Sequence, residues 1–280
     1  MVELEAGCEY PRSPSRQQSM EPRMPSKDLR PIIQDWPFES GQIKVRKIRG
    51  LDNRVKIQMR VDLGVLQMET EGRPDGQRPF NYESLLEYHL ARLESHKRRN
   101  GTDLGFSLSP DECLAIRDES LQYYHRYLAS FAMEDYDMVV RDTQRNLDVL
   151  DLCCKYGEQE SDRMALEAHR PYIIMMNTRA KALGAIGNGQ YLTALAHVER
   201  GLVSIRDFFK KYGTSKSFNH SPEVVILKAL RREVRKQLPV DPIRKLKQEL
   251  ADAVAEERFE DAAQLRDSLE ALLKQHGGQS

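Results

Sequence analysis

The residues best suited to chemistry are scattered along this 280-residue chain, and their spacing matches no common catalytic or metal-binding pattern. The four cysteines include no C-x-x-C pair, which a zinc or redox site of the usual kind would need. His89 and His96 stand seven positions apart, without the H-E-x-x-H arrangement of zinc hydrolases. The sequence also has no G-x-x-x-x-G-K-[ST] loop to bind nucleotide phosphates. We therefore expect no catalytic residue, no cofactor and no metal site, and we interpret the chain as a non-enzyme.

The overall composition narrows the class of protein further. The chain has 43 basic and 43 acidic residues, so its net charge gives no reason to expect binding to nucleic acid or to a membrane surface. No apolar run approaches the 18 or so residues of a membrane span, and the N-terminus lacks the apolar core of a signal peptide. With no evident disulfide framework among the cysteines, we expect a cytoplasmic protein.

Strict alternation of apolar and polar residues predicts a small antiparallel sheet between residues 43 and 70. Basic residues dominate its solvated face, and Asp52 is the single acid expected to oppose them. Basic side chains on a sheet can follow a phosphate backbone. The residues expected to make such contacts are Lys44, Arg46, Arg54, Lys56 and Arg60. No aromatic residues alternate with them for base stacking, and a solvated face balanced by acids elsewhere is the favoured alternative.

A long helical region follows, and its start and stop signals are clear. Asn100-Gly101 ends one helix, and Ser109 with Glu112 forms a capping box for the next. Pro171 predicts the start of a later helix or a kink within it. Residues 133–147 also align with residues 188–202, which indicates an internal repeat of 55 positions.

The second of these two segments, N-G-Q-Y-L-T-A-L, is similar to the centre of a tetratricopeptide repeat, although the 55-residue spacing exceeds the 34 residues of that family. The resemblance implies two long helical hairpins stacked side by side. Such a stack presents a groove, and two roles remain open for it: binding a peptide, or simply positioning the two ends of the chain.

The last stretch, residues 241–275, predicts a pair of helices. Asp241 and Pro242 suit the start of the first helix, and Phe259 begins the second after a charged corner. Small residues, Ala262 and Ala263, are expected where the two helices come close. A hairpin of this size buries too little apolar surface to fold alone, so it must dock on the body of the protein, on a second copy, or on a partner.

The run F-E-D-A-A-Q-L-R-D at residues 259–267, with Leu246 and Leu250 upstream, resembles the UVR motif of the excision-repair proteins UvrB and UvrC. The resemblance implies a protein-docking module, with a partner of the UvrB/UvrC type or another regulator. Some regulators with this hairpin carry zinc-binding cysteine pairs, and this chain departs from them. The expected partner-binding residues are Leu246, Leu250, Phe259, Ala262, Ala263, Leu265, Arg266, Asp267 and Leu269.

Taken together, the patterns predict an α+β protein that is mainly α. The expected parts are a disordered tail (1–30), a β meander (31–78), a tetratricopeptide-like helical domain (79–213), a linker with a basic helix (214–240) and the UVR hairpin (241–276). The leading hypothesis is a non-enzymatic adaptor that docks through the hairpin. The alternatives are a nucleic-acid-binding accessory of excision repair and a homodimer formed by two hairpins in a four-helix bundle.

Overall fold

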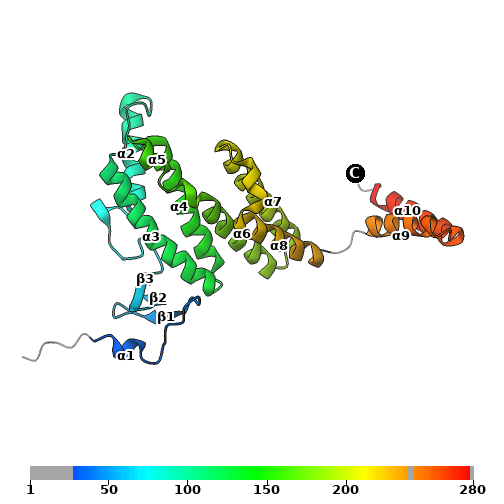
Figure 1. Cartoon of the computed structure of the whole chain (residues 1–280), viewed down its shortest axis with the longest axis horizontal. Helices are drawn as coiled ribbons and strands as arrows, with labels where there is room; N and C mark the ends of the chain where they lie inside the picture. Colours follow the sequence, from blue (N-terminus) through cyan, green and yellow to red (C-terminus); the bar gives the residue numbers. More distant parts are fainter. Residues whose placement is uncertain (1–27, 239–241, 278–280) are drawn as a thin grey trace, which may run out of the picture. The chain divides into compact units, whose positions relative to one another are not determined.

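The computed structural model describes residues 28–238 and 242–277, and it places side chains over 28–238 and 246–270. The chain divides into two compact units, Met1–Pro37 and Phe38–Ser280. In the first unit the structure describes one short helix, α1 (Arg30–Ile33). The predicted disordered tail lies outside the described residues, except for positions 28–30. In the second unit the described residues are mainly helical, with one small sheet, as the sequence predicts (Figure 1).

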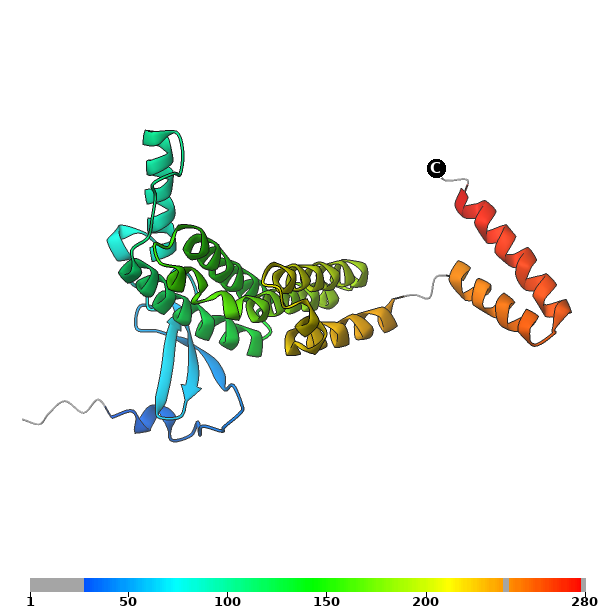
Figure 2. The ribbon, with the colours of Figure 1, turned by 45° about the horizontal axis from the view of Figure 1, so that its top comes forward.

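The sheet is an antiparallel meander of three strands in the order β1-β2-β3 (Figure 2). Its strands are β1 (Val45–Arg49), β2 (Val55–Val61) and β3 (Gly64–Glu69). On one face Ile57, Met59 and Met68 are buried and join a cluster with Ala129 and Met138 from the helices. The alternation seen in the sequence therefore arises because one face of the sheet packs against the helical region.

Helices make up most of the chain after the sheet. Their bounds are η1 (Pro79–Asn81), α2 (Leu85–Asn100), α3 (Pro110–Ala132), α4 (Tyr136–Tyr156), α5 (Glu160–Met164), η2 (Glu167–His169), α6 (Arg170–Gly187), α7 (Tyr191–Lys211), η3 (Ser215–His220), α8 (Pro222–Gln237), α9 (Pro242–Ala255) and α10 (Phe259–Gly277).

The predicted helix signals act as expected. The Ser109 hydroxyl accepts a hydrogen bond from the Glu112 backbone N–H (3.3 Å), and the Glu112 carboxylate accepts one from the Ser109 N–H (3.0 Å), so the capping box is confirmed. Gly101 adopts a positive φ of 71° at the end of α2, a conformation that costs glycine little. Pro171 lies in the first turn of α6, so it starts that helix and does not kink it.

The turns between α3 and α4 and between α6 and α7 have the same backbone geometry. The N–H of Asp135 donates to the Ser130 carbonyl (2.9 Å), and 55 positions later the N–H of Gln190 donates to the Ala185 carbonyl (2.8 Å). The residue before each donor has a positive φ, 60° at Glu134 and 72° at Gly189. The internal repeat thus corresponds to two helical hairpins with one kind of turn. Their tetratricopeptide resemblance stays a prediction.

The main apolar core is formed by residues of α3, α4, α6, α7 and α8, and α8 packs against both α6 and α7. Val139 of α4, Ala194 and Val198 of α7, and Leu227 of α8 are fully buried within it. A second cluster joins α2, α3 and α4 around Ile116 and Val149. Helices α3, α4, α6, α7 and α8 therefore form one helical layer around a shared apolar core, which fixes how α4, α6 and α7 face one another.

A buried ionic network attaches the chain after β3 to this helical layer. Arg126 of α3 and Asp142 of α4, each 1% exposed, form a two-pronged ion pair at 2.6 and 2.9 Å. Arg126 also donates to the backbone carbonyls of Glu69 (3.0 Å) and Gly72 (2.8 Å). This pair was not predicted, because two charges 16 positions apart give no periodic signal in the sequence.

Candidate functional site

The C-terminal hairpin consists of α9 and α10, joined by a corner at residues 256–258. The N–H of Arg258 donates to the Ala253 carbonyl (2.8 Å), and Glu257 adopts a positive φ of 58°, so the chain reverses within one tight turn. Arg258 also bonds Asp261 at 2.6 Å, across the first turn of α10. Ala253 and Ala262 are buried, at 0% and 7% exposure, where the two helices meet. Small side chains there allow the helices a close approach.

The predicted partner-binding residues fall into two groups in this hairpin. Leu246, Leu250, Leu265 and Leu269 are half-buried, at helical spacings that place them on the same faces as Ala253 and Ala262. The four leucines therefore lie on the sides of α9 and α10 that face each other. Their role in binding a partner stays a prediction.

The second group faces outward. Phe259 is 68% exposed, and its neighbour across the corner, Val254, is 52% exposed. Arg266 and Asp267 are exposed and pair with each other at 2.9 Å, a contact that contributes little stability in water. Ala263 is exposed as well, so the expectation that it lies in the seam is wrong: one residue beyond Ala262 is a rotation of about 100° around the helix.

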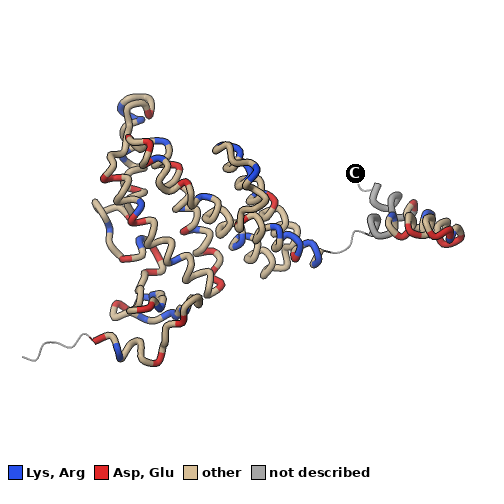
Figure 3. Tube along the Cα trace, viewed as in Figure 1, with Lys and Arg blue, Asp and Glu red and all other residues tan. Residues whose placement is uncertain are grey.

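The basic face of the sheet is largely neutralised by the protein itself. Lys44 pairs with Glu39, and Lys56 pairs with both Asp52 (2.9 Å) and Glu69. The expectation that Asp52 alone opposes the basic residues is therefore wrong, since two further acids take part. These bonds raise the pKa of Lys56, chiefly through Glu69 and then Asp52. Figure 3 shows both signs of charge along the strands.

The other predicted phosphate contacts have different surroundings. Arg46 donates to the Gln58 side chain at 2.8 Å, on the same face as Lys56. Arg60 is 9% exposed and donates to the Gly64 carbonyl (2.9 Å), which fastens the turn between β2 and β3. Arg54 is exposed. A phosphate backbone on this face would have to compete with the internal bonds of most of these cations.

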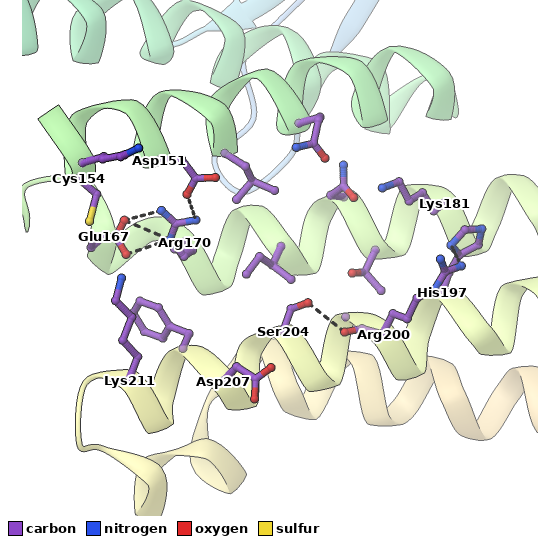
Figure 4. Close-up of a pocket in the computed structure, with 18 residues that line it drawn as sticks. Asp151, Cys154, Glu167, Arg170, Lys181, His197, Arg200, Ser204, Asp207 and Lys211 are labelled. Carbon is purple, nitrogen blue, oxygen red and sulfur yellow. Dashed lines mark hydrogen bonds and ion pairs between the residues drawn. The ribbon is translucent and has the colours of Figure 1, made fainter. Parts of the chain in front are cut away.

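A groove of about 990 Å³ lies between α4, α6 and α7 (Figure 4). The sequence analysis predicted a groove but named none of its residues, because the packing of α4, η2, α6 and α7 against one another is what brings the lining together. The residues that line it are Gln144, Leu147, Asp151, Cys154, Lys155, Glu167, Arg170, Ile174, Asn177, Thr178, Lys181, His197, Arg200, Gly201, Ser204, Asp207, Phe208 and Lys211.

The floor of this groove depends on Gly201 of α7. A Cβ atom at this position would lie 2.2 Å from Thr178 Oγ1 and 2.6 Å from Thr178 Cγ2 on α6. Because both atoms belong to a β-branched side chain on a packed helix, they cannot easily move away. Glycine therefore lets α6 and α7 approach closely under the groove.

We expect Gly201→Ala to lower the free energy of unfolding by about 1–3 kcal/mol, because the added methyl group overpacks the α6–α7 contact. Urea unfolding followed by circular dichroism measures the change. Gly187→Ala is the matched control, since nothing lies within 4 Å of a Cβ atom there and the substitution favours helix. Equal stability of Gly201→Ala and the parent protein would contradict the close approach.

Over residues 28–238 and 242–277, no three His, Cys, Asp or Glu side chains are grouped to hold a metal ion. Over the same residues, no helix combines the length and the apolar character needed to cross a bilayer.

Comparison with known proteins identifies the hairpin. The UVR family, described as the UvrB/uvrC motif, matches residues 241–275. Searches of curated proteins and of solved structures found no significant match to the chain. The motif occurs in excision-repair proteins of the UvrB/UvrC type and mediates protein interactions. The C-terminal helical pair of this chain is therefore a UVR motif, joined to a helical body and a small sheet.

Proposed function

We propose that this protein is a non-enzymatic adaptor that docks on another protein through its UVR hairpin. The observation that carries the proposal is Phe259, a large aromatic side chain that is 68% exposed at the first position of α10. Val254, near the end of α9, is a second exposed apolar side chain of the hairpin, at 52%. Aromatic side chains on small rigid elements are the usual anchors of protein interfaces. Burying an exposed phenylalanine contributes roughly 1.5–3 kcal/mol.

Because Phe259 is exposed, a substitution there should affect the binding of a partner without affecting the folding of the hairpin. Ala253 and Ala262 fill the seam between the two helices, whereas Phe259 points away from it. A polar residue at position 259 should therefore leave the hairpin intact while it removes the anchor. Asp is suitable because it also favours the first turn of a helix.

We expect Phe259→Asp to weaken binding to the partner roughly 30-fold or more, which corresponds to the loss of about 2 kcal/mol at an interface anchor. The assay is affinity capture from native lysate with nuclease present, mass spectrometry of the bound protein, and titration of the purified partner. Purified UvrB and UvrC form a second arm of the titration. Leu63→Asp is the matched control, because Leu63 is 88% exposed but lies in the turn between β2 and β3, outside the hairpin.

Two results would speak against this proposal. If the same protein binds Phe259→Asp with parent affinity, the hairpin corner is not the docking surface. If capture depends on nucleic acid, so that nuclease alone removes the bound material, the accessory-factor alternative gains instead. That alternative has less support, because Lys44 and Lys56 are already paired with Glu39, Asp52 and Glu69.

The homodimer alternative predicts a different oligomeric state for the protein. Two hairpins in a four-helix bundle would bury the Phe259 surface against its own copy. Analytical ultracentrifugation would then give twice the 32.3 kDa chain mass, reduced to one chain mass by Phe259→Asp. A single-chain mass for the parent protein excludes this alternative and leaves the corner free for a different partner.

A further inference from the structure

We propose that the groove between α4, α6 and α7 binds an extended acidic peptide segment of a partner protein, whose carboxylates lie at the end of the groove lined by Lys181, His197 and Arg200. This would be a second binding site, and it does not depend on the function proposed for the hairpin. Three observations support it: an unpaired cationic cluster, a difference in charge between the two ends of the groove, and apolar side chains in its lining.

The cationic cluster occupies one end of the groove, where Figure 4 shows Lys181, His197 and Arg200 close together. Arg200 Nη2 lies 3.0 Å from His197 Nδ1, so the arginine donates to the neutral ring. In the described part of the chain, no carboxylate lies within 4.0 Å of a charged nitrogen of these three residues. Neighbouring cationic side chains in proteins are usually paired with carboxylates or separated by water. A cluster of them without a carboxylate is suited to bind an anionic ligand.

The pKa values of His197 and Lys181 are also consistent with an anion-binding cluster. Burial lowers the pKa of His197 below its usual value, and the nearby charges of Arg200 and Lys181 lower it further. Burial and Arg200 likewise lower the pKa of Lys181. Burial is the larger cause of both shifts, and the positive charges of Lys181 and Arg200 add to it. A negatively charged group beside these two side chains would offset their repulsion.

At the opposite end of the groove the arginine is already paired with two acids. Arg170 pairs with Asp151 at 2.8 Å and with Glu167 through two side-chain nitrogens. Although burial alone would raise the pKa of Glu167, hydrogen bonds from Arg170 and Tyr212 lower it, so this carboxylate stays ionised. The acids Asp151 and Glu167 therefore lie at this end, with Lys211 as a further cation, whereas no acid among the described residues pairs with the cations of the other end. This difference in charge would orient a ligand that carries its negative charge at one end.

The lining of the groove favours a peptide over a nucleic acid. Leu147, Ile174 and Phe208 supply apolar surface in it, which side chains of a peptide can cover. Asp207 also lines the groove, and together with Asp151 and Glu167 it would repel a continuous phosphate backbone. A volume of about 990 Å³ lies at the upper end of ligand sites, which fits an extended segment better than a small molecule.

The test is fluorescence anisotropy with the full-length protein and a labelled peptide of four consecutive glutamates flanked by leucine and glycine. A matched peptide with glutamine in place of glutamate is the first control. We expect the glutamate peptide to bind at least roughly tenfold more tightly than the glutamine peptide, because charge-assisted contacts are lost in the latter. Binding should also shift the NMR signals of the His197 ring.

The variants Lys181→Glu and Arg200→Glu should each weaken binding of the glutamate peptide roughly tenfold or more. Lys210→Glu is the matched charge reversal, because Lys210 is exposed on α7 and does not line the groove. Lys181→Gln provides a milder change in case charge reversal perturbs the fold. Parent-like affinity in the Lys181 and Arg200 variants, or an equal loss in Lys210→Glu, would overturn the proposal.

Two further arms distinguish a peptide groove from a nucleic-acid site and from the hairpin surface. If single-stranded oligothymidylate binds more tightly than the glutamate peptide and competes with it, the groove is a nucleic-acid site and the proposal fails. Phe259→Asp should bind the glutamate peptide with parent affinity, since the groove lies within α4, α6 and α7. A failure of the groove thus leaves the hairpin result unaffected, and the reverse also holds.

Discussion

Asp142→Asn is expected to lower the free energy of unfolding by about 3–5 kcal/mol, the usual cost of breaking a buried ion pair from one side. The neutral amide would leave the Arg126 guanidinium, 1% exposed, without a negative partner. Arg141 would lose the same carboxylate, which it contacts at 3.0 Å. Because Arg126 also holds the carbonyls of Glu69 and Gly72, the attachment of the sheet to the helices should weaken as well.

Urea unfolding at neutral pH, followed by circular dichroism, measures this effect. Asp148→Asn on the same helix is the matched control, because Asp148 is exposed and bonds only the Gln144 side chain (3.0 Å), a contact that contributes little stability in water. The double variant Arg126→Met with Asp142→Leu should be less destabilised than the sum of the two single changes, since neither charge is then left buried alone. A loss below about 1 kcal/mol in Asp142→Asn would contradict the buried pair.

Lowering the pH from 6.5 to 4 is expected to destabilise the protein through His89, which is 2% exposed on α2. Burial chiefly, and the positive charge of Arg92, lower the pKa of His89 to about 4, against the opposing effect of Glu112. Arg92 Nη1 lies 2.9 Å from Nδ1 of the ring, so the folded protein holds the neutral form. In the unfolded chain the ring takes up its proton near pH 6.5.

The direction in which stability changes with pH follows from the number of protons that each state binds. Between pH 6.5 and 4 the unfolded state binds more protons than the folded state, so stability falls as the pH falls, by up to about 1.4 kcal/mol per unit from this residue. Urea unfolding of the parent protein and of His89→Gln across this range isolates the effect. His220→Gln, at an exposed site, should follow the parent curve. Parallel curves for all three proteins would show that His89 does not stay neutral in the fold.

Much of the fold could be predicted because the relevant signals are local. The alternation of Val55, Ile57 and Met59 predicts the strand β2, and Ser109 with Glu112 predicts the start of a helix. The expectation of a solvated second face is wrong at Gln58 and Arg60, which are 7% and 9% exposed. The hairpin is equally local, since Pro242 and Phe259 begin its two helices as expected. In each case the residues that produce the structure lie within a few positions of one another.

The groove and the ionic contacts could not be predicted in the same way. Lys181 and His197 lie on different helices, and only the packing of α6 on α7 brings them together. Glu69 pairs with Lys56 because the register of β2 and β3 places them opposite, and alternation alone does not give a register. The spacing of His197 and Arg200, three positions apart on one helix face, was a signal that sequence reasoning could have used.

The neutralised sheet face has a consequence for kinetics. With Glu39, Asp52 and Glu69 set against its lysines, and 43 basic residues balancing 43 acidic ones, the molecule creates little electric field at long range. An approaching protein more than about 8 Å away, the Debye length at physiological ionic strength, is neither attracted nor repelled. The hairpin should then meet its partner by ordinary diffusion, at about 10⁵–10⁷ M⁻¹ s⁻¹ with little dependence on salt. Differences in affinity between partners would then arise mainly from differences in the dissociation rate constants of the complexes.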